Sequence, residues 1–383
     1  FLILGFVQGL TSGLSIITSQ KFGANNEDAV RKSFAASILI SSAVAIITTV
    51  FSVLLTRPLL ELLQTPAEII DDATAYLVII FLGIPATILF NLLSNAVRAL
   101  GDSKTPLYFL IFACCVNIVL DLVFILYLHL GVAGAGIATI LSQLLSGILC
   151  IFFIIKKVPI LRLKKADFQI HYEVIASHLS IALPMAFQMS IIAIGSLMLQ
   201  FALNGLGAAS VAAYTASQKI ESIATMPLGS FGTAMATYAA QNYGAGKISR
   251  IRKGVFQCIL MSGSFSILSG AINIVAGSQL TSIFVGSQET EVLSLSHTYL
   301  VISGCFYFAL ALLFIYRFTL QGLGKSFIPT VAGVMELIMR AIGALVLTGA
   351  FGFAGACASN PLAWIGACIP LACSYYRTMK RLN

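Results

Sequence analysis

Long apolar runs alternate with short polar loops along the chain, and this pattern predicts membrane-spanning helices. The stretch 33–55, for example, contains no charged side chain at all. A helix of about 20 apolar residues crosses the hydrocarbon core of a bilayer, which is about 30 Å thick. We predict eleven spans, near residues 1–19, 33–55, 75–97, 106–128, 132–155, 179–203, 211–240, 254–277, 296–320, 328–350 and 353–376. In the first span, Gly5, Gly9 and Gly13 form a face of small residues that allows another helix to approach closely.

The composition excludes a soluble protein. Apolar residues make up 58% of the 383 residues and charged residues only 9%, and the mean hydropathy is +0.98. A soluble protein can bury one such apolar helix but not a dozen, so we expect an all-α polytopic membrane protein. The net charge of +8 does not indicate nucleic-acid binding, because the basic residues lie in short loops between the apolar runs.

The chain contains an internal repeat. Four short segments recur in the same order: 20–24 as 241–245, 76–79 as 299–302, 100–106 as 323–329 and 131–135 as 352–356. The offset between the two copies is nearly the same for all four segments, so the register is kept across most of the chain. Two related apolar halves are typical of membrane transporters that move one half against the other.

The loops alternate in charge, which predicts the orientation in the membrane. One set of loops carries 18 of the 22 basic residues, whereas the opposite set carries only Arg57 beside six acidic residues. Basic loops face the cytoplasm in most membrane proteins. We therefore expect a multi-pass protein of the cell membrane, in a bacterium the inner membrane, with its C-terminus in the cytoplasm.

The odd number of spans predicts a missing first helix. The span 179–203 has no counterpart in the first half. At the offset of the repeat, its counterpart would begin before residue 1. We expect twelve helices in the complete protein, in two pseudo-symmetric lobes of six whose repeats run parallel. The predicted domains are an N-lobe at 1–155 without its first helix, a cytoplasmic linker at 156–178 and a C-lobe at 179–383.

A single carboxylate inside the first half is the strongest candidate for chemistry. Asp121 has no basic residue within a helical turn, and Asn117 lies four residues earlier on the same face. Thr139 on the next span is a third oxygen-bearing side chain for the same pocket. An unpaired acid at this depth is expensive in hydrocarbon and marks a functional site by default. We interpret the three residues as a site for a coupling proton or cation, with a structural polar cluster as the alternative.

The second half carries more ionisable residues. Glu336 and Arg340 lie four residues apart, and we interpret them as a structural ion pair. Lys219 and Glu221 cannot pair along their helix, so they face either a substrate cavity or partners on other helices. Arg317 lies near a cytoplasmic end, where we expect its side chain to snorkel toward water. Two glutamines of the span 179–203 are candidates for a substrate cavity or for helix packing, Gln188 and Gln200.

Several function classes are absent from the pattern. The chain has no P-loop, no Gly-rich nucleotide loop and no nucleophile constellation, and its eight Cys and four His show no metal spacing. We therefore predict neither an enzyme nor a cofactor, and no metal beyond a possible Na⁺ at Asp121. Without an ATP site, transport must use an ion gradient or the gradient of the substrate.

With these motifs the chain resembles the multidrug and toxic compound extrusion (MATE) family, within the multidrug/oligosaccharidyl-lipid/polysaccharide exporter superfamily. The residues that carry the resemblance are 20–24, 98–106, 131–139, 212–214 and 241–245, with Asn117, Asp121, Pro227 and the pair of Glu336 and Arg340. The resemblance implies a two-lobe, inverted-V transporter that exports amphipathic, often cationic compounds in exchange for H⁺ or Na⁺. It implies small-molecule substrates and the bilayer as partners, and we expect a monomer.

The resemblance also implies an ion site in the N-lobe. Family members with such a site join an Asn and an Asp four residues apart to a Thr on the next helix, which Asn117, Asp121 and Thr139 match. An Asp on the first helix normally completes that site. Some relatives use a Glu on the seventh helix instead, and the span 179–203 contains none. The alternative function is a flippase for a lipid-linked oligosaccharide or polysaccharide precursor, which needs a strongly basic cavity.

Overall fold

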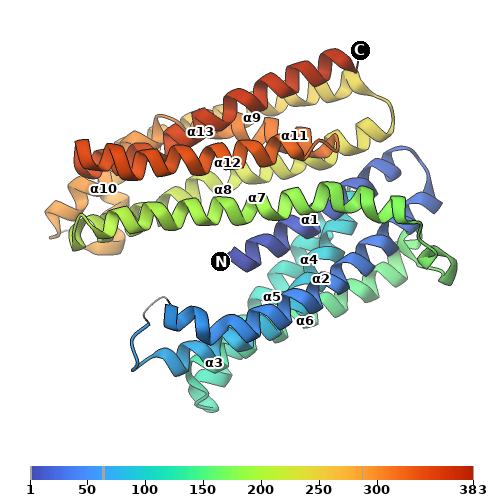
Figure 1. The fold of residues 1–383 in the computed structure, drawn as a ribbon, viewed down its shortest axis with the longest axis horizontal. Coiled ribbons are helices and arrows are strands. Elements are labelled where there is room, and N and C mark those ends of the chain that lie inside the picture. The colour runs from blue at the N-terminus through green and yellow to red at the C-terminus, as the bar shows by residue number, and fades with distance from the viewer. Residues whose placement is uncertain (1, 63–64, 287, 383) are drawn as a thin grey trace. The chain divides into compact units, whose positions relative to one another are not determined.

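The computed structural model describes residues 2–62, 65–286 and 288–382, and these are almost entirely helical, without a strand among them. Residues 1, 63, 64, 287 and 383, which the predicted spans and lobes include in part, lie outside the described residues. The helices are α1 (Leu2–Gly23), α2 (Glu27–Leu62), α3 (Ile70–Leu82), α4 (Ile84–Ala99), α5 (Lys104–Leu122), α6 (Gly131–Lys157), α7 (Tyr172–Asn204), α8 (Ala208–Gly244), α9 (Ile248–Val285), α10 (Thr290–Gly304), α11 (Tyr307–Gly322), α12 (Phe327–Ile342) and α13 (Thr348–Arg381) (Figure 1). The prediction of an all-α membrane protein is confirmed.

Short helical segments complete the element order. Two π-helical segments extend α5 and α12: η1 (Val123–Tyr127) and η4 (Gly343–Leu347). Two 3₁₀ segments lie between α6 and α7: η2 (Pro159–Leu161) and η3 (Lys165–Phe168). The π segments follow equivalent helices of the two repeats, so the structure repeats even this irregular feature.

Each predicted span corresponds to a helix or to a pair of consecutive helices. The span 75–97 consists of α3 and α4, which meet at Gly83, and the span 296–320 consists of α10 and α11, which are bent by 48°. The two breaks lie at equivalent positions of the repeat, because α4 begins at Ile84 and α11 begins at its counterpart, Tyr307. The broken spans are therefore a feature of the repeating unit.

Length and composition alone identify fewer spans than the sequence pattern predicts. In the described part of the chain, eight helical runs are long and apolar enough to cross a membrane, or nine if the bent pair counts as one span. One of the eight is the 55-residue run Phe327–Arg381, in which Gly352 adopts non-helical backbone angles. That run is long enough for two crossings, since about 20 residues suffice for one. The helix α8 is not among these runs, because its many small and polar side chains lower its mean hydropathy.

The chain packs as two compact units. One comprises Ile3–Ala186, and the other begins at Phe187 and contains the rest of the chain toward the C-terminus, so the division falls within α7. Residues 156–178, the predicted linker, belong to the first unit together with η2 and η3. These units reflect packing alone, and the functional boundaries at 155 and 179 stay a prediction.

Small residues on α1 make a close helix contact inside the first unit, as the spacing predicts. A methyl group at Gly13 would lie 2.5 Å from the Cα atom of Ala182, and one at Gly9 would lie 2.5 Å from the carbonyl oxygen of Met185. Both partners lie on the part of α7 that belongs to this unit. Glycine is therefore required at these two positions for the two backbones to approach each other.

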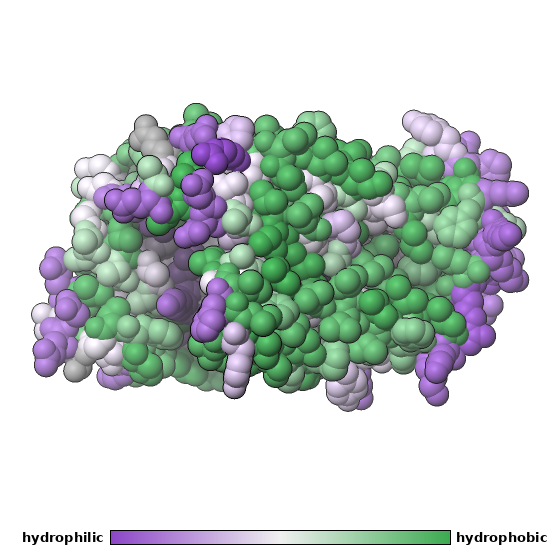
Figure 2. All heavy atoms as spheres, turned by 90° about the horizontal axis from the view of Figure 1, so that it is seen from below, coloured by the Kyte–Doolittle hydropathy of each residue, from purple (hydrophilic) through white to green (hydrophobic). Residues whose placement is uncertain are grey.

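The surface of the helices is apolar. Large side chains such as Ile46, Phe51 and Leu54 are 62–70% exposed. On the face shown in Figure 2, hydrophobic side chains cover the flanks of the helices, and hydrophilic ones gather where the helices end. Soluble proteins rarely expose apolar patches of more than a few hundred Å². This surface is therefore the one that contacts lipid.

Candidate functional site

The first candidate site lies on α5 and α6 of the first unit. Asp121 is half-buried on the last turn of α5, and its Oδ1 atom is shielded from solvent without a hydrogen-bond partner. No basic side chain forms an ion pair with it anywhere in the described residues. A buried carboxylate oxygen without a partner is costly, so a proton or a cation would stabilise it.

The two predicted neighbours of Asp121 meet each other. The Nδ2 atom of Asn117 lies 3.5 Å from the Oγ1 atom of Thr139, at the long limit of a hydrogen bond. The Thr139 hydroxyl itself donates to the carbonyl of Ala135 at 2.9 Å, so its lone pairs remain available as acceptors. Asn117 and Asp121 share one helical face, four residues apart. The arrangement thus offers amide, hydroxyl and carboxylate oxygens, which suit a hard cation.

A π-helical segment follows the candidate site. η1 begins at Val123, two residues after Asp121, and Leu128 donates its N–H to the carbonyl of Val123 at 3.0 Å. Such segments occur mostly as single turns inside α-helices, frequently at functional sites. This wider turn begins directly after the turn of α5 that carries the carboxylate.

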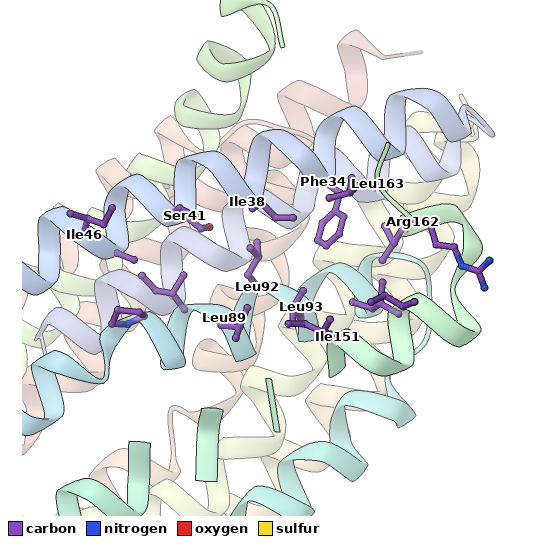
Figure 3. A pocket seen from close by; sticks show the side chains of 17 residues that line it. Phe34, Ile38, Ser41, Ile46, Leu89, Leu92, Leu93, Ile151, Arg162 and Leu163 are labelled. Carbon is purple, nitrogen blue, oxygen red and sulfur yellow. The ribbon is translucent and has the colours of Figure 1, made fainter. Parts of the chain in front are cut away.

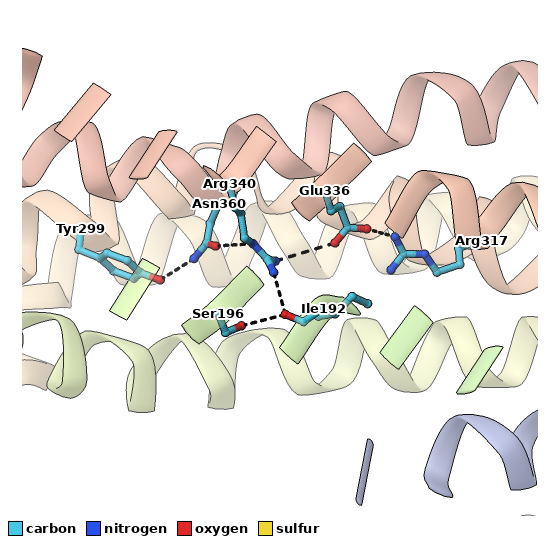
Figure 4. A network of polar contacts seen from close by, with 7 residues as sticks. All are labelled: Ile192, Ser196, Tyr299, Arg317, Glu336, Arg340 and Asn360. Carbon is cyan, nitrogen blue, oxygen red and sulfur yellow. Dashed lines mark hydrogen bonds and ion pairs between the residues drawn. The ribbon is translucent and has the colours of Figure 1, made fainter. Parts of the chain in front are cut away.

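A second polar cluster lies inside the second unit, and sequence reasoning found only parts of it (Figure 4). Tyr299 on α10 donates its hydroxyl to Glu221 on α8, with 2.5 Å between the oxygens. Asn360 on α13 donates to the same Tyr299 oxygen at 3.2 Å and accepts from the Nε atom of Arg340 at 3.1 Å. The chain of contacts then continues from Arg340 to Glu336, with 3.8 Å between Nη2 and Oε2.

Glu336 contacts two arginines. In addition to Arg340, Arg317 on α11 forms an ion pair with the other carboxylate oxygen of Glu336. The side chains of Arg317 and Glu336 are each 4% exposed. The expectation that Arg317 snorkels is therefore wrong. Its guanidinium lies in the interior because Glu336, on the neighbouring helix, provides a carboxylate for it there.

A glycine on α7 makes room for Arg340. The guanidinium of Arg340 donates through Nη1 to the carbonyl of Ile192 at 3.3 Å, and a methyl group at Gly195 would lie 3.0 Å from the same nitrogen. The Ser196 hydroxyl also donates to that carbonyl, at 3.3 Å (Figure 4). This helix therefore supplies a backbone acceptor that holds the arginine in place.

A small cavity of about 200 Å³ opens beside this cluster. Glu221, Tyr214, Arg340 and Asn360 line it together with apolar side chains that include Trp364. The Oε1 atom of Glu221 is buried. The cavity is large enough for several waters, which need polar partners of this kind.

The four residues predicted for a substrate cavity are not brought together. Glu221 lines the small cavity, whereas Lys219 is exposed on α8 with its Nζ atom 5.6 Å from the centre of the Phe284 ring. Gln188 is buried and accepts from the Nε2 atom of Gln321 at 2.8 Å. The remaining glutamine, Gln200, donates to the side chain of Asn204 at 3.1 Å. Their role in substrate binding stays a prediction.

Sequence reasoning missed Tyr299, Asn360 and the pairing of Arg317. One signal was available for Tyr299, because it begins the repeated segment 299–302. No comparable signal marks Asn360, because a single Asn in an apolar run gives no indication of its partner. The contacts join residues of α8, α10, α11, α12 and α13. These residues lie far apart in the sequence, so their contacts cannot be predicted from the spacing of residues along one helix.

The loop before α5 is held by an acid with a structural role. Asp102 accepts the backbone N–H groups of Lys104 and Thr105 at 3.0 Å each and the Thr105 hydroxyl at 2.6 Å. Partial burial would raise the pKa of Asp102, but these hydrogen bonds and the charge of Lys104 outweigh it and lower the pKa. Asp102 therefore caps α5 in its charged form.

The comparisons with known proteins agree on one family. The sequence model of the family described as MatE matches residues 1–123 and 184–346 of this chain. The "Probable multidrug resistance protein YpnP" of Bacillus subtilis (strain 168) is 34% identical over 253 residues, which cover 65% of this chain and 56% of that protein. The "Probable multidrug resistance protein YoeA" of the same organism is 27% identical over 348 residues, covering 88% of this chain and 74% of that protein.

Solved structures show the same fold. A structure described as the outward-facing conformation of a multidrug resistance MATE family transporter of the MOP superfamily matches with a TM-score of 0.94. The match covers 100% of this chain and 86% of that chain at 19% identity. At this identity the likeness establishes the fold alone.

Proposed function

Because the chain belongs to the MatE family of multi-pass membrane transporters, we propose that it exports amphipathic, often cationic compounds from the cell in exchange for H⁺ or Na⁺. The similar proteins YpnP and YoeA are both described as probable multidrug resistance proteins, which supports the export of drug-like compounds. The apolar surface of the helices supports a position in the bilayer. We place the basic loops and the C-terminus on the cytoplasmic side and expect a monomer to suffice.

The observation that carries the coupling proposal is the unpaired carboxylate of Asp121. Its buried Oδ1 atom has no hydrogen-bond partner, and no basic side chain pairs with it in the described residues. The ion that neutralises it would also contact the side-chain oxygen atoms of Asn117 and Thr139, and these two side chains already meet through the amide nitrogen of Asn117. The ion and the drug must favour different conformations, because a ligand shifts an equilibrium only by its differential affinity for the two states.

The test is efflux by the Asp121→Asn variant of the full-length protein in proteoliposomes. Asparagine keeps the size and removes the charge, so we expect ethidium efflux driven by a pH or a Na⁺ gradient to fall to the level of empty liposomes. The two gradients are applied separately, which identifies the ion. Asp72→Asn is a matched control, since this acid is exposed in the first turn of α3. Normal efflux by Asp121→Asn would exclude the role proposed for Asp121.

A flippase for a phosphate-bearing lipid is the less favoured function. Such a cargo needs basic groups without internal partners, to neutralise its phosphates. In the second unit, however, the buried guanidinium groups of Arg317 and Arg340 both contact Glu336. Lys219 is the remaining basic candidate and lies exposed, over the ring of Phe284. The charges of the second unit therefore support export of small compounds rather than of lipid-linked sugars.

A further inference from the structure

The first unit contains a long apolar groove that none of the chemistry above uses. It has a volume of about 800 Å³ and lies between α2, α4 and α6, and residues 161–163 close one end (Figure 3). Phe34, Ile38, Leu89, Leu92 and Ile151 form much of its wall. Of the 17 lining residues, only Ser41, Ser42 and Arg162 are polar. None of the three residues of the Asp121 site lines it.

The internal repeat shows that three lining positions of this groove carry larger side chains in the second unit. In the register of the repeated segments, the equivalent positions are Leu93 and Tyr316, Ile154 and Tyr375, and Ile155 and Tyr376. In the second unit these tyrosines pack together, with 5.2 Å between the ring centres of Tyr316 and Tyr375 and 6.2 Å between those of Tyr316 and Tyr376. The first unit has smaller aliphatic side chains at the same places, and all three line the groove. At these three positions the second unit therefore carries larger side chains than the first.

One charged group of the groove is accessible to a ligand, and it lies at the end of the groove. The Ser41 side chain also lines the groove, but it is only 1% exposed and its hydroxyl is buried in the wall. At the end closed by residues 161–163, the exposed guanidinium of Arg162 donates to the carbonyl of Lys156 at 3.2 Å and forms no ion pair within the described residues. Lys156, Lys157 and Lys164 are exposed nearby in the sequence. The groove thus combines a long apolar wall with a positive end.

The length of the groove corresponds to one leaflet of a bilayer. Phe34 and Ile46, which both line it, are separated by twelve residues of α2, and twelve residues rise about 18 Å in a helix. One leaflet contributes about half of the hydrocarbon core of about 30 Å. The basic end would then lie at the level of the lipid headgroups, on the side where anionic lipids attract basic residues.

We propose that this groove binds a single anionic phospholipid of the surrounding bilayer, with an acyl chain along α2, α4 and α6 and its phosphate at Arg162. The charge of the groove favours this occupant over a cationic transport substrate, because the lining contains a guanidinium and no acid. The bound lipid joins three helices and the segment 161–163, and it stabilises the first unit by mass action.

The experiment measures thermal unfolding of the delipidated full-length protein in a neutral detergent, with added phosphatidylglycerol or phosphatidylcholine. We expect phosphatidylglycerol to raise the midpoint at lower concentration than phosphatidylcholine. Arg162→Gln should weaken the apparent affinity for phosphatidylglycerol about fivefold and leave that for phosphatidylcholine unchanged. The matched control is Arg250→Gln, which removes an exposed basic residue from the first turn of α9.

A second pair of variants tests the groove itself. Leu93→Tyr introduces the side chain that the second unit carries at the equivalent position, and we expect it to abolish the lipid-dependent rise. Ile155→Tyr, at a half-exposed position of the groove, tests the same point if Leu93→Tyr does not fold. Leu260→Tyr adds the same ring at an exposed position of α9 and should respond to lipid like the unmodified protein.

Three results would overturn the proposal. The first is an equal response to both lipids that Arg162→Gln does not change. The second is a full lipid response in Leu93→Tyr and Ile155→Tyr. The third is displacement of the lipid by ethidium at the concentrations that support its transport, which would make the groove part of the substrate path. None of these results bears on Asp121, so the proposed function is tested independently.

Discussion

Glu336 is the residue on which the buried charges of the second unit depend. It contacts Arg317 through one carboxylate oxygen and Arg340 through the other, and all three side chains are at most 8% exposed. Removing one partner of a buried ion pair is strongly destabilising, because it leaves an uncompensated charge in the interior. Here one substitution would leave two guanidinium groups without their carboxylate.

We therefore expect Glu336→Gln to lower the free energy of unfolding by about 3–5 kcal/mol. The measurement is the unfolding midpoint of the purified protein in detergent. Glu291→Gln is the control, because Glu291 is exposed in the first turn of α10 and forms no ion pair within the described residues. A loss below about 1 kcal/mol, the range of exposed pairs, would contradict the role given to Glu336.

Asp102 gives a prediction that depends on pH. The lowered pKa of Asp102 means that folding favours its charged form. The contribution of Asp102 to the free energy of unfolding is therefore present above its ordinary pKa of 3.8, and it is lost as the pH falls through the lower pKa of the folded protein. Asp102→Ala should cost about 1 kcal/mol at neutral pH, as the loss of a helix cap does. The difference from the unmodified protein should shrink below pH 3.8 in unfolding curves.

Glu68→Ala is the matched control for Asp102→Ala. Glu68 is an exposed carboxylate in the loop before α3, and surface acids away from caps and pairs contribute little to stability. A pH-independent difference for Asp102→Ala would show that the cap does not rely on the charge of Asp102.

The sequence predicted single acids better than their partners. Asp121 stood out because no basic residue lies within a helical turn, and the structure brings the Asn117 amide within 3.5 Å of the Thr139 hydroxyl on the next span. Arg317 was misplaced because its position near a helix end says nothing about a carboxylate on the next helix. Local spacing reports contacts along one helix, whereas this pair depends on how two helices are rotated against each other.

At the scale of elements, the contact between α1 and the first part of α7 depends on glycine. A methyl group at Gly13 would meet backbone atoms of Ala182, which cannot move aside like a flexible side chain. Gly13→Ala should therefore push the two helices apart and cost about 1–3 kcal/mol, the range of overpacked sites. Thermal unfolding with intact membrane insertion is the measurement.

Gly229→Ala is the control for Gly13→Ala. Gly229 lies within α8 with open space around its Cα atom, so the substitution should be neutral or stabilise the helix by up to about 1 kcal/mol. An equal loss for both variants would show that the cost arises from the helix backbone and not from the close contact.

The hydrophobic pattern predicted the helices well and their irregularities poorly. Every predicted span corresponds to one helix or one consecutive pair, because a run of about 20 apolar residues has no other stable form in lipid. The π segments after α5 and α12 were not predicted, since no residue type marks them. The break at Gly83 recurs between α10 and α11, where Phe306 stands at the position equivalent to this glycine.

At the scale of the whole molecule, the orientation in the membrane is the prediction with the widest consequences. The loops that carry most of the basic residues alternate with loops that carry acids, and the basic set should face the cytoplasm. The direction of transport and the leaflet that supplies the proposed phospholipid both depend on this assignment. Reversal would place Arg162 at the outer surface and make the outer leaflet the source of that lipid.

Labelling of single cysteines in intact cells tests the orientation directly. After the eight native cysteines are replaced, Gln288→Cys lies in an acidic loop and Ser249→Cys in a basic one, and both positions are accessible at helix ends. A maleimide that cannot cross the membrane should label Gln288→Cys and leave Ser249→Cys unlabelled until the cells are lysed. Lysis is the internal control, because it must make both positions reactive. The opposite pattern in intact cells would mean that the charge of these short loops does not set the orientation, and the cytoplasmic position of the C-terminus would be wrong with it.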